Sequence, residues 1–247
     1  MIINADKGNI KVLGDIREFK TSIDPKNLEF ITTLLSSNLY SDPEQSFIRE
    51  IVSNAWDSHV EAGTTDIPVI IRFKRGNDGW EVTIRDFGTG LSPERFQEVY
   101  CNIGSSTKRE SNEFIGGFGI GKYSSLACTN TVYITSYYEG TAFLYVMVKS
   151  GNTITTNLVM KKPTEEKNGV EVTIKNIPNI IPYRKALKYI VFFPNVYVDG
   201  IDNRLNNTKL KRFNNFAVAA EPIDTKILLG NVLYPYNARL LSSASND

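Results

Sequence analysis

The sequence predicts an α+β fold, a two-layer sandwich in which helices cover one face of a mixed, mostly antiparallel sheet. Two helical patterns come first, over residues 25–39 and 43–62, and most of the strand-like segments follow them. Helices grouped ahead of strands are typical of this class, whereas strict alternation of strands and helices would indicate a parallel sheet. The hydrophobic share of 41% and the charged share of 22% support a substantial core and argue against disorder.

The N-terminal part of the chain is expected to hold an edge element and a helix. Residues 1–24 are polar with short alternating pieces such as "IREFKTSI", which indicates an arm or an edge strand. A helix is predicted from Pro25 to about Leu39, because Asp24 offers a capping side chain and proline suits the first helical position.

The second helix carries a similar start signal and a clear stop signal. Ser41 or Asp42 caps it, Pro43 opens it, and Gly63 follows its last residue. Ser and Asp side chains accept hydrogen bonds from the free amides of a first turn, and glycine readily adopts the left-handed conformation that ends a helix. We therefore predict a helix over residues 43–62.

The rest of the core is predicted to consist mainly of strands joined by short turns. "IPVIIRFKR" and "GWEVTIRD" flank the turn-forming Gly76-Asn77-Asp78-Gly79, which predicts a hairpin. Further strands are predicted at residues 131–140, 141–150, 152–162, 169–177, 195–200 and 226–235, and helices near Ser92, near Lys122 and over 182–193. The glycine- and serine-rich segment 87–121 is long and largely irregular, which indicates either a functional loop or a disordered one.

Length and composition limit the classes of protein that the chain can represent. Its 247 residues suit one large domain, assigned to residues 25–200, with 201–247 as an extension or the start of another domain. The net charge of +1 gives no sign of a protein that binds polyanions over its whole surface. Cys101 and Cys128 lack metal-ligand spacing, and the start lacks a signal-peptide pattern. No stretch approaches the length of a membrane span, so we expect a cytoplasmic protein.

A polar stripe runs along the second predicted helix. Glu50, Asn54 and Asp57 recur at i, i+4 and i+7, so their side chains share one face. The helix alone leaves open an ordinary solvated face, although Asn and Asp are mediocre helix formers. On the functional interpretation, Asn54 offers a neutral oxygen to Mg2+ and Glu50 accepts a proton from an attacking water, while Asp57 supports a base pocket.

Two glycine-containing segments strengthen the functional interpretation. In "DFGTG", Asp86 follows a strand directly, and Gly88 and Gly90 let the backbone pass close to a flat ligand. The Asp86 carboxylate can then accept a hydrogen bond from an exocyclic amine of that ligand. Such a string on its own is more often a plain turn. The second segment, "IGGFGIGKYSS", places flexible glycine amides ahead of a helix, which favours an anion site over a mere flexible loop. It nearly matches a P-loop, but Tyr123 stands where that motif needs Ser or Thr.

Together these stretches resemble the GHKL superfamily of ATPases, which comprises gyrase, the ninety-kilodalton heat-shock chaperone, histidine kinases and MutL-type repair proteins. The resemblance covers roughly residues 40–175 and implies a Bergerat-type fold. "FIREIVSNAWD" is similar to the family's N box, which implies Glu50 as general base and Asn54 as magnesium ligand. "DFGTG" is similar to the adenine box, which implies Asp86 as the acceptor of the adenine amine.

The same resemblance implies a phosphate site and a lid. "NIGSSTK" and "IGGFGIGKYSS" resemble the chaperone-type ATP lid and its glycine box. The phosphates would then contact Gly117, Gly119 and Gly121, with Lys122 and Lys108 as helpers.

One position departs from the family pattern. Many members carry a threonine directly after a glycine on a late strand, where it contacts the adenine side through water. Here Val170 follows Gly169, and the nearest hydroxyl belongs to Thr173. We therefore assign that contact to Thr173 as an expectation.

Three stretches resemble one branch of the superfamily, the rapid-lysis IIA proteins of T-even-like phages. These stretches are "NAWDSH", "SNEFIGGFGIGKYS" and "LLGNVLYP". The resemblance implies a phage or prophage protein that acts in the host cytoplasm.

The sequence thus predicts a nucleotide-driven switch that binds Mg-ATP or ADP, with residues 92–121 as its closing lid. Only about 47 residues follow the recognisable core, so we expect that a cation from a further domain is missing and that hydrolysis is slow. A longer chain would form an ATP-dependent homodimer; its client, protein or DNA, stays open. The alternatives are a degenerate nucleotide-binding scaffold and a protein kinase. The only histidine, His59, is expected to pack on the helix's apolar face, which counts against a histidine kinase.

Overall fold

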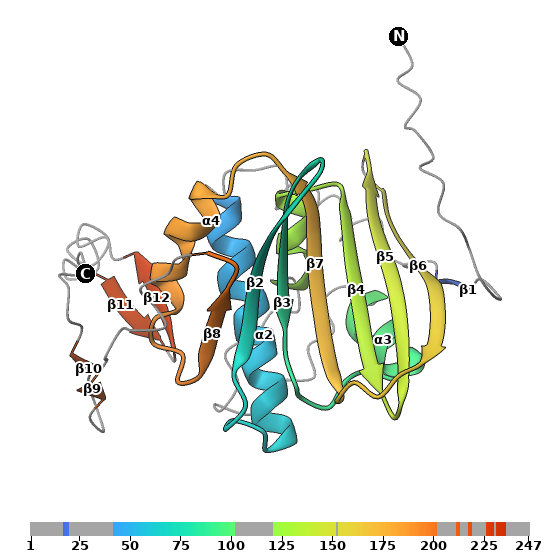
Figure 1. The fold of residues 1–247 in the computed structure, drawn as a ribbon, viewed down its shortest axis with the longest axis horizontal. Helices are drawn as coiled ribbons and strands as arrows, with labels where there is room; N and C mark the ends of the chain where they lie inside the picture. Colours follow the sequence, from blue (N-terminus) through green and yellow to red (C-terminus); the bar gives the residue numbers. More distant parts are fainter. Residues whose placement is uncertain are drawn as a thin grey trace, which may run out of the picture.

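The computed structural model describes residues 42–101, 121–151 and 153–201, with the short stretches 17–19, 211–212, 217–218, 226–229 and 231–235. It has two layers, an eight-stranded sheet and a set of helices on one of its faces (Figure 1). The predicted α+β sandwich is therefore confirmed. The predicted helix over 25–39 lies outside the described residues, as does most of the proposed lid, residues 102–120.

The sheet is mixed and mostly antiparallel. Its strands follow the order β1-β6-β5-β4-β7-β3-β2-β8, and the pair β2 and β8 is parallel while the other pairs are antiparallel. The strands are β1 (Arg17–Phe19), β2 (Val69–Gly76), β3 (Gly79–Arg85), β4 (Thr131–Tyr138), β5 (Thr141–Ser150), β6 (Thr153–Pro163), β7 (Gly169–Ile177) and β8 (Val196–Asp199). Strands β4, β5 and β6 form the predicted meander, whereas β7 returns to pair with β3 and β4.

Helix α2 (Pro43–Ala62) begins and ends where its sequence signals predict. The Asp42 side chain accepts a hydrogen bond from the amide of Gln45 at 3.0 Å, and proline occupies the first turn. Gly63 ends the helix in the left-handed conformation, with φ of +69°. These caps satisfy backbone groups that a helix end otherwise leaves unpaired.

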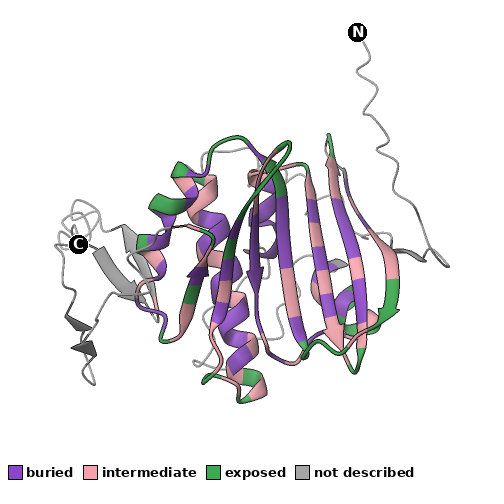
Figure 2. Ribbon diagram, viewed as in Figure 1, coloured by how far each residue is buried: buried purple, intermediate pink, exposed green. Residues whose placement is uncertain are grey.

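The hydrophobic core lies between α2 and the sheet. Phe47 and Ile48 on the helix are fully buried, as are Ile71 on β2 and Val82 on β3. Figure 2 shows buried residues along α2 and along the central strands. Burying a side chain of this size contributes roughly 2 kcal/mol of stability. Helix α4 (Ile181–Ala186) and the 3-10 turn η4 (Leu187–Ile190) pack beside α2 in the same layer. The apolar face of α2 is thereby fixed against the strands.

Three predicted elements differ from the observed ones. The helix predicted over 182–193 is shorter and ends at Ile190. The single late strand over 226–235 is wrong: the chain forms a hairpin of β11 (Lys226–Leu229) and β12 (Val232–Pro235), because Gly and Asn between them favour a tight turn. The helix expected near Lys122 is the 3-10 helix η3 (Gly121–Ala127). A two-stranded sheet of β9 (Lys211–Arg212) and β10 (Ala217–Val218) was not predicted.

The proposed lid begins with two short helical elements. Ser92 caps α3 (Pro93–Phe96), as its sequence predicts, by accepting a hydrogen bond from the amide of Arg95 at 3.2 Å. The chain then continues as a π-helical turn, η2 (Gln97–Cys101). Within the described part of the chain, no helix has the length and apolar character needed to cross a membrane.

Candidate functional site

The polar stripe of α2 is partly buried. Asp57 is only 1% exposed, whereas Glu50 and Asn54 are half-buried. Glu50 is held through one oxygen, because the Arg49 guanidinium donates to Oε1 from two nitrogens at 3.1 and 2.9 Å. Burial of Asp57 excludes the interpretation of the stripe as a plain solvated face, since a carboxylate is rarely buried without a structural or chemical reason.

The start of η3 lies directly against Glu50. Helix η3 packs on α2, and a Cβ added to Gly121 would collide with Oε2 of Glu50. A side chain here would force the Glu50 carboxylate to move, so glycine keeps the backbone close to it. The beginning of the predicted phosphate segment and the predicted general base are thus neighbours.

Asp86 sits in a buried pocket at the end of β3. Its Oδ1 accepts the amide of Gly88 at 2.9 Å, and its Oδ2 accepts the amide of Val170 at 3.1 Å. The Ser58 side chain also hydrogen-bonds to the carboxylate. Burial raises the pKa of Asp86 to about 6, against the opposing effects of these hydrogen bonds and of Arg85. Asp86 is accordingly a fixed acceptor that titrates near neutral pH.

The glycines after Asp86 are required by close packing. A Cβ on Gly88 would collide with the Ser58 hydroxyl and lie 2.5 Å from the Ser58 carbonyl oxygen. Gly90 has φ of +68°, and its α-carbon faces the Tyr137 carbonyl so closely that a side chain would collide with it. The loop from Asp86 to Gly90 therefore lies in close contact with α2 at Gly88 and with β4 at Gly90, as the close-approach interpretation requires.

Two serines that the sequence analysis missed hold this loop. Ser58 contacts both Asp86 and Gly88, and the Ser136 hydroxyl accepts the Leu91 amide and donates to the Leu91 carbonyl, each at 2.8 Å. Ser58 had a detectable signal, because it extends the helical spacing from Glu50 and Asn54 by four more residues. Ser136 had none, since it stands in an ordinary alternating strand.

The predicted cationic helper Lys122 is only 7% exposed. Its ammonium donates to the carbonyl of Val99 in η2, and the hydroxyl of Tyr123 donates to the carbonyl of Tyr100 at 2.5 Å. These bonds tie the start of η3 to the end of η2. The other predicted phosphate residues, Lys108, Gly117 and Gly119, lie outside the described residues.

Thr173 is not brought into the site. On β7 the neighbours Val172 and Ile174 pack in the core beneath the helices, and side chains alternate between the two faces of a strand. Thr173 consequently points to the opposite face, where its hydroxyl lies 3.0 Å from that of Thr83 on β3. This geometry therefore gives no support to the expected contact of Thr173 with the adenine side.

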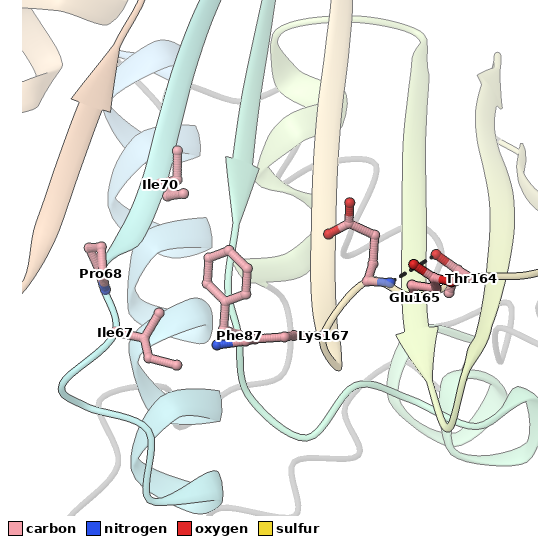
Figure 3. A pocket seen from close by; sticks show the side chains of 8 residues that line it. Ile67, Pro68, Ile70, Phe87, Thr164, Glu165 and Lys167 are labelled. Carbon is pink, nitrogen blue, oxygen red and sulfur yellow. Dashed lines mark hydrogen bonds between the residues drawn. The ribbon is translucent and has the colours of Figure 1, made fainter.

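A separate cavity of about 500 Å3 opens on the helix-free face of the sheet (Figure 3). It is lined by apolar and charged side chains, namely Ile67, Pro68, Ile70, Phe87, Thr164, Glu165, Glu166 and Lys167. Ile70 alternates with the core residue Ile71, so the cavity and the polar stripe of α2 lie on opposite sides of the sheet. Beside it, Arg85 stacks on Phe87 and Tyr137 and donates to the Lys167 carbonyl at 2.6 Å.

The donor set on α2 fits a magnesium ion carried by phosphates. Mg2+ in such sites usually takes one or two protein oxygens, with phosphates and waters completing its shell. Among the described residues, no three His, Cys, Asp or Glu side chains gather as a separate metal site. Asn54 offers its amide oxygen one turn from Glu50, and the Gly121 backbone lies close to the Glu50 carboxylate. These residues are compatible with a nucleotide-bound ion.

The fold and these boxes together define an ATPase domain of the GHKL class. Residues 40–176 match the family described as histidine kinase-, DNA gyrase B- and HSP90-like ATPase, and the chain belongs to this family. Membership indicates a domain that binds and hydrolyses ATP.

Individual relatives are chaperones. The chain is 30% identical to the chaperone protein HtpG of Rickettsia akari over 187 residues, which cover 65% of this chain and 29% of the relative. It is 29% identical to the HtpG of Francisella tularensis subsp. tularensis over 225 residues, which cover 78% of this chain and 33% of the relative. The chain thus spans about a third of the length of these curated relatives.

Proposed function

We propose that this chain binds Mg-ATP along α2, with the base at Asp86 and the phosphates toward Gly121, and hydrolyses it. The observation that carries the proposal is that two glycine backbones press on one helix face, Gly88 at Ser58 and Gly121 at Glu50. The two contacts are about 12 Å apart along the helix at 1.5 Å per residue, a span that suits an extended nucleoside triphosphate.

The proposed roles follow from the chemistry of each side chain. Asp86 accepts the exocyclic amine of adenine, and the buried Asp57 supports the base pocket from α2. Gly88 and Gly90 permit the close approach of the base. When Mg2+ is bound it neutralises phosphate charge, and Asn54 supplies an amide oxygen for it.

Hydrolysis in this proposal uses Glu50 as general base. A water oxygen bonds to the terminal phosphorus as the bond to the ADP oxygen breaks, and the proton of the water passes to the Glu50 carboxylate. Oxygen Oε2 faces Gly121, whereas Oε1 is engaged by Arg49. We propose that turnover is slow for two reasons. The Glu50 carboxylate is paired with the Arg49 guanidinium, which leaves it less free to accept a proton, and a further cation must stabilise the transferred phosphoryl group.

We also propose that residues 92–121 act as a lid. The support is that both flanks of the segment are anchored to the rest of the domain: the Leu91 backbone bonds to the Ser136 hydroxyl on β4, and η3 packs on α2. Motion between fixed ends is the usual arrangement of a closing loop, which excludes water from the reaction. The proposed phosphate residues Lys108, Gly117 and Gly119 belong to this segment.

The broader assignments are proposals that rest on sequence alone. They comprise the domain limits of 25–200 and 201–247, an ATP-dependent homodimer, the rapid-lysis IIA-like branch and a place in the host cytoplasm. The stretches "NAWDSH" and "LLGNVLYP" support the phage branch.

One experiment tests the proposed function and its main alternative together. Calorimetry with Mg-ATP, Mg-ADP and Mg-GTP measures binding and base preference, and phosphate release measures turnover in the same preparation. We expect adenine-selective binding and slow release of phosphate. Binding without any release favours the degenerate scaffold, and no binding of any nucleotide overturns the proposal.

A further inference from the structure

His59 is a buried polar side chain between α2 and the loop that carries Asp86. It is fully buried, with the rings of Trp56 and Phe87 at centroid distances of 6.3 and 6.4 Å. Its Nε2 accepts a hydrogen bond from the backbone amide of Phe87 at 2.7 Å. The ring is therefore packed on the apolar side of the helix, as expected, but makes a polar contact with the site.

The contact fixes the protonation state of the imidazole. An amide N–H can only donate, so Nε2 must carry a lone pair and the ring proton must reside on Nδ1. Burial lowers the pKa of His59, and Arg85 lowers it further, against the opposing influence of the Ile67 and Thr64 backbone. Among the described residues, Nδ1 is buried and has no hydrogen-bond partner. The ring is consequently neutral and acts as an acceptor at neutral pH.

Both backbone polar groups of Phe87 are held by residues at the end of α2 or just after it. His59 takes the amide, and the Thr64 hydroxyl donates to the Phe87 carbonyl at 3.0 Å. Phe87 lies between Asp86 and Gly88, whose amide bonds to the Asp86 carboxylate. Fixing this one residue therefore fixes the direction in which the carboxylate points.

We infer that His59 is a positioning residue for recognition of the base. It couples the helix that carries Glu50 and Asn54 to the Asp86 loop, so that the phosphate end and the base end of the site keep a fixed separation. A leucine would fill the same apolar space but would leave the Phe87 amide buried without an acceptor. The inference rests on the proposed nucleotide site, and it adds the link that holds the two ends together.

The first test does not depend on nucleotide. His59 is the only histidine in the chain, so isotope-labelled histidine gives one imidazole signal by nuclear magnetic resonance. We expect a neutral ring with the proton on Nδ1 at neutral pH, and slow exchange of the Phe87 amide. A proton on Nε2, or a charged ring at neutral pH, would overturn the inference even if ATP binds normally.

The second test compares two substitutions by calorimetry with ATP and GTP. In His59→Gln the amide oxygen can accept the same N–H, so ATP affinity should stay within about threefold of the parent. In His59→Leu the loop loses its acceptor, so ATP affinity should fall by about tenfold and the preference for ATP over GTP should shrink. Ser53→Ala serves as the control, because among the described residues this buried hydroxyl bonds to its own helix alone, at the Arg49 carbonyl.

The outcomes separate positioning from general stability. A merely structural role would reduce the fraction of active protein without changing the preference between the bases. If His59→Leu does not fold, His59→Gln decides: retained preference supports the inference, and lost preference in a folded protein overturns it. If the parent binds no nucleotide, the proposed function fails, while the ring signal and the exchange of the Phe87 amide in His59→Gln still show whether His59 fixes the loop.

Discussion

Among single residues, Asp86 combines deep burial with a full set of partners. Both carboxylate oxygens accept backbone amides, from Gly88 and Val170. In Asp86→Asn, one amide nitrogen would face a backbone donor or the adenine amine, so ATP binding should weaken by about a hundredfold or more. Calorimetry measures this effect, and thermal melting shows whether the fold survives. Unchanged affinity in a folded variant would remove Asp86 from the base site.

Glu50 should affect rate without affecting binding. Removing a general base typically lowers the rate by about a hundred- to ten-thousandfold. Glu50→Ala should therefore bind Mg-ATP nearly as the parent does and release almost no phosphate, whereas Asn54→Ala should weaken binding in a magnesium-dependent way. A Glu50→Ala variant that loses binding but keeps its turnover per bound ATP would show that Glu50 is structural.

The raised pKa of Asp86 makes nucleotide binding depend on pH. The pKa of Asp86 is about 6 in the folded protein, against 3.8 for an unperturbed Asp. Below pH 6 the free protein therefore holds a proton on this carboxylate, and the carboxylate must lose it to accept a hydrogen bond from the adenine amine. ATP affinity should fall about tenfold per unit below pH 6 and level off above about pH 7. Because its pKa is raised in the folded state, Asp86 contributes to the stability of the nucleotide-free protein below its unfolded pKa. That contribution is lost as the pH rises through 6. Calorimetry in buffers of different ionisation heat should detect the release of this proton on ATP binding. An ATP affinity that stays constant from about pH 5 to pH 8 would contradict the prediction.

Between elements, the approach of the glycine loops to α2 decides the shape of the site. In Gly88→Ala, the new methyl group would collide with Ser58, so ATP binding should be largely lost. Removing the hydroxyl with Ser58→Ala should not rescue it, because the Ser58 carbonyl oxygen lies only 2.5 Å from the added Cβ. Gly151→Ala is the matched control: its φ of +57° strains alanine, but nothing lies within 4 Å. Calorimetry should separate the two, and normal binding by Gly88→Ala would contradict the close approach.

The elements also show what a sequence can predict. Strands β2 to β7 follow from period-two patterns and turn residues, and α2 follows from its caps at Asp42 and Gly63, because these signals are local. The late hairpin at 226–235 was predicted as one strand, although Gly230-Asn231 marks a turn. Thr173 was placed by its chemistry alone, and counting strand period from the core residue Val172 would have placed it on the outer face.

The candidate site was predictable in part for a similar reason. Local sequence patterns predict Glu50 and Asn54 from their helical spacing and Asp86 from its position after a strand. Ser136 and the acceptor role of His59 do not, because each depends on a partner that is far away in the sequence, Leu91 and Phe87 respectively. Contacts of this kind come from the packing of the two layers.

For the whole molecule, binding energy should appear as folding stability. A ligand that binds only the folded state adds about 2.7 kcal/mol at a hundred times its dissociation constant. For a chain of this size that corresponds to a rise in Tm of roughly 5 to 10 °C. Melting with saturating Mg-ATP should show this rise in the parent and hardly any in Asp86→Asn. An equal rise in both would place the nucleotide elsewhere, for example at the cavity on the helix-free face.

The place of β7 in the sheet has a consequence for synthesis of the chain. Strand β7 inserts between β3 and β4, so the amide of Val170 reaches an Asp86 that lies 84 positions earlier. Pairing across such a separation requires closure of a long loop and slows folding. During translation, the base pocket therefore remains incomplete until the last core strands have left the ribosome. Until then the nascent chain exposes the apolar face of α2 and one unpaired edge of β3, the two surfaces that a chaperone would shield.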